Sequence, residues 1–235
     1  MKNLRILILI FTLVTILFSV KVTAQDEPAT DESDSPFSVG VDVVTNYIWR
    51  GSKFGSGPAL QPSIKYTIGG FSAGIWGSFD ASGYQEADPF ISYTAPFGLT
   101  LSVNDYYYPE LDLFDVSDTS GSHGLELIGA YEFKGLSLTV GYIVNEAPGA
   151  GTKGGDTYVQ AGYSFKNFDI FIGAGNGWYV PTNIGSDENE FKICNIGIST
   201  SKEIKITESF KIPVFGQIIV NPDQEKLFLV VGLTF

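Results

Sequence analysis

Ten charged side chains in this sequence fall on the polar face of alternating segments, and they are the residues best suited to act on a solute. They are Asp42, Arg50, Lys65, Asp80, Glu86, Asp88, Glu126, Glu132, Asp169 and Lys192. Charges that line a passage select ions and polar solutes through their local field and through hydrogen bonds. Arg50 is the strongest single candidate, because a guanidinium can bridge several carboxylates in a fixed fork.

Two of these carboxylates offer a choice of chemistry. Glu86 and Asp88 lie two residues apart, so on a strand they point the same way. Such a pair suits a hard cation that prefers oxygen ligands. An ion pair with Arg50 or Lys65 is the more common arrangement for carboxylates in this position. The sequence leaves both interpretations open.

Residues for hydrolytic catalysis or for a transition-metal site are scarce. His123 is the sole histidine and Cys194 the sole cysteine. Ser122 and His123 are adjacent and would face opposite sides of a strand, so they do not form a catalytic pair. The glycine-rich stretch at residues 149–155 (GAGTKGG) precedes no predicted helix, which a phosphate-binding loop requires. We therefore expect a protein that is not an enzyme and that uses no cofactor or metal.

The first 24 residues predict a cleaved export signal. Lys2 and Arg5 precede a hydrophobic run from Ile6 to Val20, and small or neutral residues lead to a cleavage point after Ala24. The alternative is an uncleaved membrane anchor, but the run is shorter than the roughly 20 residues that span a bilayer. Cleavage leaves 11 basic against 26 acidic residues, a net charge of −15. This balance argues against a nucleic-acid partner.

The next segment, residues 25–36, is acidic and lacks hydrophobic periodicity. Such a composition predicts a disordered tail. Calcium binding is an alternative use of its acidic residues, but their spacing matches no known calcium loop. We therefore place one folded domain at residues 37–235.

From Phe37 onward, polar and apolar residues alternate about a dozen times, which predicts β-strands. The last strand is typical: Leu227, Leu229, Val231 and Phe235 share one face. The predicted strands cover residues 37–50, 60–68, 71–80, 86–95, 98–108, 123–133, 135–146, 155–165, 167–177, 190–200, 210–220 and 226–235.

The connections between these strands alternate in length. Tight turns are predicted at residues 69–70, 95–97, 134–135 and 166–167, and longer polar loops at 51–58, 81–85, 109–122, 147–154 and 178–189. Bacterial transmembrane barrels have short periplasmic turns, long extracellular loops and an even number of strands. We therefore predict a closed antiparallel outer-membrane β-barrel of about twelve strands, with both termini periplasmic. The last pair of connections is atypical, with a long turn at 201–209 and a short loop at 221–225.

Aromatic residues on the apolar face gather toward the strand ends. One predicted girdle contains Phe37, Tyr66, Phe71, Tyr93, Phe133, Phe165, Phe168 and Phe235, and the other Tyr47, Trp49, Phe79, Tyr107 and Tyr142. Two girdles at the depth of the headgroups are typical of membrane barrels. Packing in a soluble core is the alternative. The apolar face is therefore predicted to meet lipid and the charged face to line the lumen.

Three prolines lie inside predicted strands, at Pro62, Pro89 and Pro213. Proline lacks the N–H that a strand ladder needs, and a closed barrel has no free edge. Each proline should therefore mark a bulge, a strand end or a misplaced boundary.

Several short motifs, taken in order, resemble the TorF-type porin family. They are Thr45–Gly51 (TNYIWRG), Gly57–Gln61 (GPALQ), Gly74–Ser78 (GIWGS), Glu86-x-Asp88, Tyr106–Pro109 (YYYP) and Val231–Phe235 (VGLTF). Phe90 departs from the family pattern, which has tyrosine after the Glu-x-Asp pair. The resemblance implies an outer-membrane location and a diffusion channel, and it implies no particular substrate.

The predicted function is that of a passive, narrow channel for small polar solutes or ions across the outer membrane. About twelve strands enclose a lumen between that of the small filled barrels and that of the large porins. Bulky residues are also expected inside: Trp76, Phe90, Tyr106, Tyr108, Tyr158, Phe171, Phe215 and Phe228. Inward charges that pair with one another would instead plug the barrel. A further alternative is a non-conducting receptor or adhesin that binds a partner through loop 109–122. The oligomeric state stays open.

Overall fold

The computed structural model describes residues 35–180, 190–208 and 210–235. The predicted signal peptide, residues 1–24, and the predicted tail up to residue 34 lie outside the described residues. Apart from Ser35, the described residues belong to one compact unit, Pro36–Phe235. Among them, no helix is long and apolar enough to cross a membrane.

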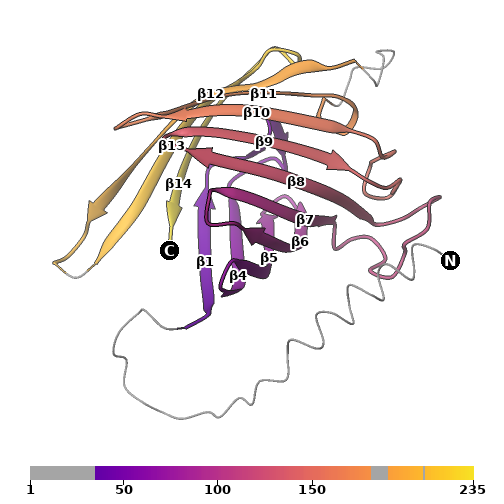
Figure 1. The fold of residues 1–235 in the computed structure, drawn as a ribbon, viewed down its shortest axis with the longest axis horizontal. Helices are drawn as coiled ribbons and strands as arrows, with labels where there is room; N and C mark the ends of the chain where they lie inside the picture. Colours follow the sequence, from indigo (N-terminus) through magenta and orange to yellow (C-terminus); the bar gives the residue numbers. More distant parts are fainter. Residues whose placement is uncertain (1–34, 181–189, 209) are drawn as a thin grey trace, which may run out of the picture. The chain divides into compact units, whose positions relative to one another are not determined.

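Within the described residues, twelve strands form one closed antiparallel barrel (Figure 1). They are β1 (Phe37–Val44), β4 (Ala59–Ile68), β5 (Phe71–Asp80), β6 (Gln85–Thr94), β7 (Leu99–Tyr107), β8 (His123–Phe133), β9 (Leu136–Ile143), β10 (Thr157–Ser164), β11 (Asp169–Gly175), β12 (Lys192–Lys205), β13 (Lys211–Asn221) and β14 (Lys226–Thr234). Strands adjacent in this order are paired, and β1 closes the barrel against β14. The predicted all-β barrel and its strand number are confirmed.

Three short elements lie outside the barrel wall. Strands β2 (Tyr47–Trp49) and β3 (Ser52–Phe54) form a separate hairpin between β1 and β4. A single 3₁₀ turn, η1 (Gly177–Tyr179), follows β11. The β2–β3 hairpin and η1 both pack against residues on the inner face of the wall.

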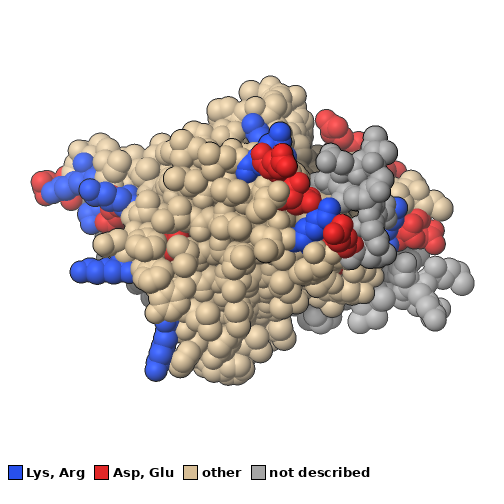
Figure 2. Space-filling view, turned by 90° about the horizontal axis from the view of Figure 1, so that it is seen from above, with Lys and Arg blue, Asp and Glu red and all other residues tan. Residues whose placement is uncertain are grey.

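The apolar face of the wall points outward. Ile64 and Leu127 have 46% and 48% of their surface exposed, whereas Glu126, the neighbour of Leu127, is completely buried. Because side chains alternate across a strand, neighbouring residues lie on opposite faces of the wall, and here the open face carries the apolar residues. Figure 2 shows a broad surface that carries few acidic or basic residues, with charges toward its two ends. The orientation predicted from the sequence is therefore confirmed at these residues.

The two ends of the barrel differ in their connections, as expected. One end, called here the turn end, carries residues 69–70, 95–98, 134–135, 165–168, 206–208 and 210, together with Pro36 and Phe235. The other end, the loop end, carries residues 45–58, 81–84, 108–122, 144–156, 176–180, 190–191 and 222–225. The predicted long turn at 201–209 is wrong in part, since residues 201–205 continue β12 and pair with residues 211–215.

Each of the three prolines interrupts pairing on one side of its strand. The β4–β5 ladder omits Pro62, the β6–β7 ladder begins only after Pro89, and the β13–β14 ladder begins only after Pro213. On the other side each proline keeps a partner strand. A missing N–H is tolerated at such places, because no ladder hydrogen bond is needed there.

Candidate functional site

The first feature of the interior is the hairpin that follows β1. The wall strand ends at Val44, and β2 and β3 then pair with each other through Tyr47↔Phe54 and Trp49↔Ser52. Arg50 and Gly51 form the turn, with φ of 49° and 83°. Two successive residues with positive φ are typical of the two-residue turns that suit the twist of a hairpin, and glycine adopts this conformation without strain.

The hairpin packs inside the barrel and not on its outer face. The ring of Tyr47 lies 5.3 Å from that of Trp76, and the ring of Trp49 lies 5.3 Å from that of Tyr106. Tyr47 is 8% exposed. The prediction that Tyr47 and Trp49 belong to a lipid-facing girdle is therefore wrong. The alternation of residues 45–50 is real, but it belongs to a second hairpin and not to a longer β1.

Arg50, at the tip of this hairpin, forms an ion pair with Glu126 of β8. Both guanidinium NH₂ groups donate to the carboxylate, at 2.5 Å to Oε1 and 3.2 Å to Oε2. The side chain of Glu126 is fully buried and that of Arg50 is 11% exposed. A bidentate pair of this kind fixes both groups in one geometry. Of the ten residues predicted from the sequence, the structure thus joins Arg50 and Glu126 directly.

Two tyrosines complete the hydrogen bonding of Glu126. The Tyr106 hydroxyl donates to Oε2 at 2.5 Å, and the Tyr179 hydroxyl donates to Oε1 at 2.7 Å. Tyr179 belongs to η1, where burial and the charge of Glu126 raise the pKa of its hydroxyl well above the ordinary value. The hydroxyl therefore stays protonated and donates a hydrogen bond to Glu126. A buried carboxylate needs such partners to offset the loss of water.

Aromatic rings surround the guanidinium of Arg50. Its central carbon lies 4.5 Å from the ring centroid of Trp49, 4.4 Å from that of Tyr158 and 4.9 Å from that of Tyr179. Ring faces attract a cation, most strongly where water is excluded. The ion pair is therefore enclosed by the rings as well as by the wall.

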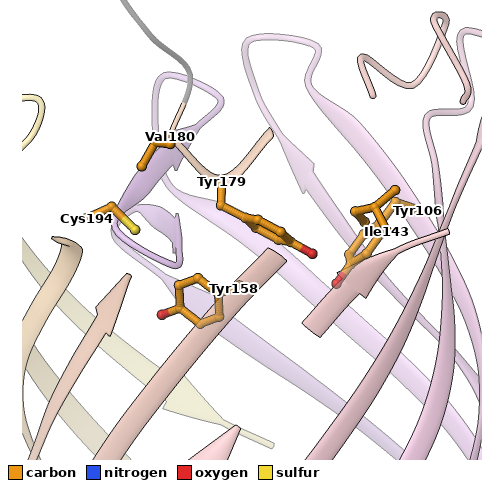
Figure 3. Close-up of a cluster of buried hydrophobic side chains, with 6 residues drawn as sticks. All are labelled: Tyr106, Ile143, Tyr158, Tyr179, Val180 and Cys194. Atoms are coloured by element: carbon orange, nitrogen blue, oxygen red, sulfur yellow. The ribbon is translucent and has the colours of Figure 1, made fainter. Parts of the chain in front are cut away.

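A buried cluster extends this arrangement across the loop-end half of the interior, as Figure 3 shows. Its buried members are Tyr106, Ile143, Tyr158, Tyr179, Val180 and Cys194, with Trp49 and Trp178 packed against them. We call this cluster, together with the β2–β3 hairpin and the Arg50–Glu126 pair, the plug. Sequence reasoning placed Tyr106 and Tyr158 inside but missed Tyr179, because η1 has no strand periodicity.

Glu86 and Asp88 come together on β6, near the plug. They are only 2% and 4% exposed. The Tyr84 hydroxyl donates to Glu86 at 2.7 Å, and the backbone N–H of Tyr107 donates to Asp88 at 3.3 Å. Tyr84 lies between β5 and β6, and burial together with the charge of Glu86 raises its pKa well above the ordinary value. Within the described residues, neither carboxylate forms an ion pair with a lysine or an arginine, so the expected pairing of these acids with Arg50 or Lys65 is not found.

A pocket of about 190 Å³ lies beside Asp88. It is lined by Tyr47, Trp49, Trp76, Asp88, Phe90, Asn104 and Tyr106. Across the wall, Trp76 pairs in register with Asp88, and Phe90 pairs with Asn104. Tyr47 and Trp49 belong to the hairpin. The hairpin therefore contributes one side of this pocket, and strands β5, β6 and β7 contribute the rest.

The turn-end half of the barrel contains a larger and more polar cavity. It has a volume of about 480 Å³, and its polar lining includes Glu132, Lys134, Ser137, Gln160, Ser164 and Asp169. Small residues such as Gly162 leave this space open. Two of the ten predicted charged residues, Glu132 and Asp169, thus share one cavity.

The remaining predicted residues lie apart from these groups. The Asp80 carboxylate accepts hydrogen bonds from backbone N–H groups of Ser56 and Ser82 and so organises loops at the loop end. Lys192 forms ion pairs with Glu190 and Asp223 at the same end. Asp42 is half-buried opposite Gln61, and Lys65 is exposed opposite Ser38.

His123 has a structural contact that the sequence did not suggest. Its Nδ1 lies 2.8 Å from Asp105 Oδ2, its Nε2 lies 2.8 Å from the Leu113 carbonyl oxygen, and its ring stacks on Tyr107. These contacts join β7 and β8 to the loop between them. Pairing of the two strands is needed to bring Asp105 and His123 together, so spacing along the chain gave no signal.

A protein-family model described as a bacterial protein of unknown function (Gcw_chp) matches residues 28–211. This match covers well over half of the sequence. The chain belongs to the Gcw_chp family. No curated protein matches this Gcw_chp chain significantly.

Two solved structures resemble the Gcw_chp barrel distantly. One is titled "Asymmetric conductivity of engineered proteins" and has a TM-score of 0.39. The other is a mutant of Rh. blastica porin, with a TM-score of 0.40. Each is 14% identical, and the match covers 75% of this chain and 55% of the other. The Gcw_chp chain thus spans little more than half the length of these structures.

Proposed function

We propose that the protein is an outer-membrane barrel that acts as a passive, narrow channel for small polar solutes or ions. The exposed apolar belt supports a membrane location, since a wall of this kind is stable when lipid covers it. The sequence resemblance to TorF-type porins agrees with this proposal. The signal peptide, the periplasmic position of the turn end and the outer membrane as the destination are parts of the same proposal.

The observation that carries the proposal is the contrast inside the barrel between a polar cavity at the turn end and the Arg50–Glu126 pair at the plug. The cavity of about 480 Å³ gives hydrated solutes a place to enter. The Glu126 carboxylate of the ion pair is fully buried, and we infer that this pair forms the constriction of the channel. A guanidinium and a carboxylate at a constriction act on both ions and neutral polar solutes. The channel is therefore narrow, and its selectivity depends on these two groups.

The test is the single-channel current of the purified protein in a planar bilayer. Arg50→Ala removes the positive charge and leaves Glu126, so we expect a larger current and a reversal potential shifted toward cations. Lys192→Ala is the matched control, because Lys192 is a basic residue at the loop end that pairs with Asp223 and Glu190. It should leave current and selectivity close to those of the wild type.

Insertion of each variant is checked by its heat-modifiable mobility in gels. If inserted Arg50→Ala protein carries the same current with the same selectivity as the wild type, the constriction is not at Arg50. If the wild-type protein inserts and carries no current under any salt condition, the channel function is wrong.

A second candidate is a surface receptor, and one observation favours it. Phe114 is 84% exposed and Leu113 is 52% exposed, both on the loop between β7 and β8. Exposed apolar residues on a loop are suited to a partner protein. Deletion of residues 110–120 distinguishes the two functions: a channel keeps its conductance, whereas a receptor loses its ligand and nothing else.

A further inference from the structure

The pocket beside Asp88 combines two properties that point to one kind of ligand. Five of its lining side chains are aromatic: Tyr47, Trp49, Trp76, Phe90 and Tyr106. The remaining two are Asp88 and Asn104. Aromatic faces with a carboxylate form the usual environment for organic ammonium ions, which are attracted to the rings and to the negative charge.

The two acidic side chains beside the pocket, Glu86 and Asp88, have no basic partner among the described residues. Glu126 already has Arg50 as its partner. Glu86 and Asp88 are almost fully buried, and in the described part of the chain no lysine or arginine pairs with either. A buried carboxylate is unfavourable without a positive partner. Two neighbouring buried carboxyl groups without such a partner avoid ionisation by holding a proton, and a bound cation would make their ionised form favourable.

The size of the pocket suits a small organic cation. Its volume of about 190 Å³ is many times that needed for one water molecule. The rings of Tyr47 and Trp76 are 5.3 Å apart, and so are those of Trp49 and Tyr106, so ring pairs from the hairpin and from the wall already meet at this place. A compact, weakly hydrated head group fits such a space better than a strongly hydrated metal ion, because Asp88 is the one acidic residue among seven lining residues, five of which are aromatic.

We propose that this pocket binds a small organic ammonium ion, with Asp88 as its charge partner and Trp49 and Trp76 as its ring partners. The proposal deepens the proposed channel function by naming a solute class, and it rests on that function only in requiring that solutes reach the lumen. Because Trp49 belongs to the hairpin, the ligand contacts the plug as well as the wall.

The first experiment measures equilibrium binding of choline to the full protein in a non-ionic detergent that has no ammonium group. Tryptophan fluorescence is the readout, since two of the three tryptophans line the pocket. The neutral isostere 3,3-dimethyl-1-butanol is the control ligand. We expect a saturable change with choline and at least about tenfold weaker binding of the alcohol. Equal binding of the two ligands, or no saturable binding of choline, would overturn the proposal.

Two variants locate the site. Asp88→Asn keeps the size of the side chain and removes its charge, and we expect choline affinity to fall about tenfold or more. Asp118→Asn makes the same change in the exposed part of loop 108–122 and should leave the affinity unchanged. Equal affinities in wild type and Asp88→Asn protein would overturn the assignment, as would equal losses in both variants.

Trp76→Leu provides a second route if Asp88→Asn protein does not fold. It removes a ring from the wall and leaves the hairpin intact, and it should weaken choline binding severalfold while the isostere is little affected. Binding without any bilayer current would refute the channel and leave the ammonium site standing. A measurable current without choline binding would refute the ammonium site and leave the channel standing.

Discussion

The two halves of the barrel interior are built on different principles. At the loop end, aromatic rings and one ion pair pack around a smaller pocket of about 190 Å³, and residues such as Tyr158 and Tyr179 are as buried as those of a soluble core. At the turn end, small and polar residues such as Ser137 and Gly162 surround a cavity of about 480 Å³. The same twelve strands run through both halves. Whether a half of the interior is packed or open therefore depends on side-chain size along each strand and on the inward-folding β2–β3 hairpin.

This difference has consequences for stability. Side chains of the plug contact one another closely, so a change there removes packing or leaves a buried charge without a partner. Side chains at the turn end border an open polar cavity, so a substitution there removes little packing. Substitutions in the two halves should consequently differ in their effect on unfolding, and the following variants test this from the largest effect to the smallest.

Glu126→Ala should have the largest effect. It leaves Arg50 buried inside the barrel without its carboxylate, and removing one partner of a buried ion pair costs about 3–5 kcal/mol. Urea-dependent unfolding from lipid vesicles measures the change. Glu132→Ala at the turn end is the matched control and should change the free energy of unfolding by less than about 0.5 kcal/mol. Similar losses for the two variants would contradict the contrast between the halves.

Trp49→Ala comes next, with an expected loss of about 3 kcal/mol. The Trp49 ring contacts Tyr106, Trp178 and the guanidinium of Arg50, so its removal opens a cavity in the plug. Phe97→Ala serves as the control, because Phe97 lies in a turn and is 66% exposed. A loss for Trp49→Ala no larger than that for Phe97→Ala would show that the hairpin packs loosely.

Tyr179→Phe should cost about 1–2 kcal/mol. The ring stays in place, and only the hydroxyl that donates to Glu126 is lost, which leaves part of a buried carboxylate without its hydrogen bond. Tyr142→Phe removes a hydroxyl from a side chain that is 45% exposed on the outer face. The same vesicle assay compares the two, and we expect no measurable change for Tyr142→Phe.

Ser137→Cys should have the smallest effect on stability and a clear effect on labelling. Ser137 lines the turn-end cavity, so a thiol there should react with a water-soluble methanethiosulfonate reagent. The native Cys194 is fully buried in the plug and should stay unmodified. Labelling of the wild-type protein, whose sole cysteine is Cys194, is the control. Rapid labelling of Cys194 in the folded wild type would mean that water reaches the plug as freely as the cavity.

Much of this fold follows from sequence periodicity. Strict alternation predicted the wall strands, and the burial of Glu126 beside the exposed Leu127 agrees with it. Alternation of this kind is reliable because a closed wall has one enclosed face and one open face along each strand. The short connections were also predictable, since glycine pairs such as Gly69-Gly70 mark tight turns.

The interior of the plug was less predictable. Residues 45–50 continue the alternation of β1, so nothing in the pattern shows that the chain leaves the wall after Val44. Arg50-Gly51 is a turn signal that identifies the hairpin only when both sides are recognised as strands of three residues. The partnership of Arg50 with Glu126 joins residues 76 positions apart. Such a pairing depends on barrel closure and hairpin insertion, which local sequence does not contain.

The most direct test of this account replaces the hairpin by a minimal turn. Val44 and Ala59 are paired in register, so an Asn-Gly turn can join them in place of residues 45–58. If the hairpin closes the loop end of the barrel, the shortened protein will still insert into a planar bilayer and will carry a substantially larger single-channel current than the wild type. An inserted barrel with unchanged current would show that the hairpin does not restrict the lumen.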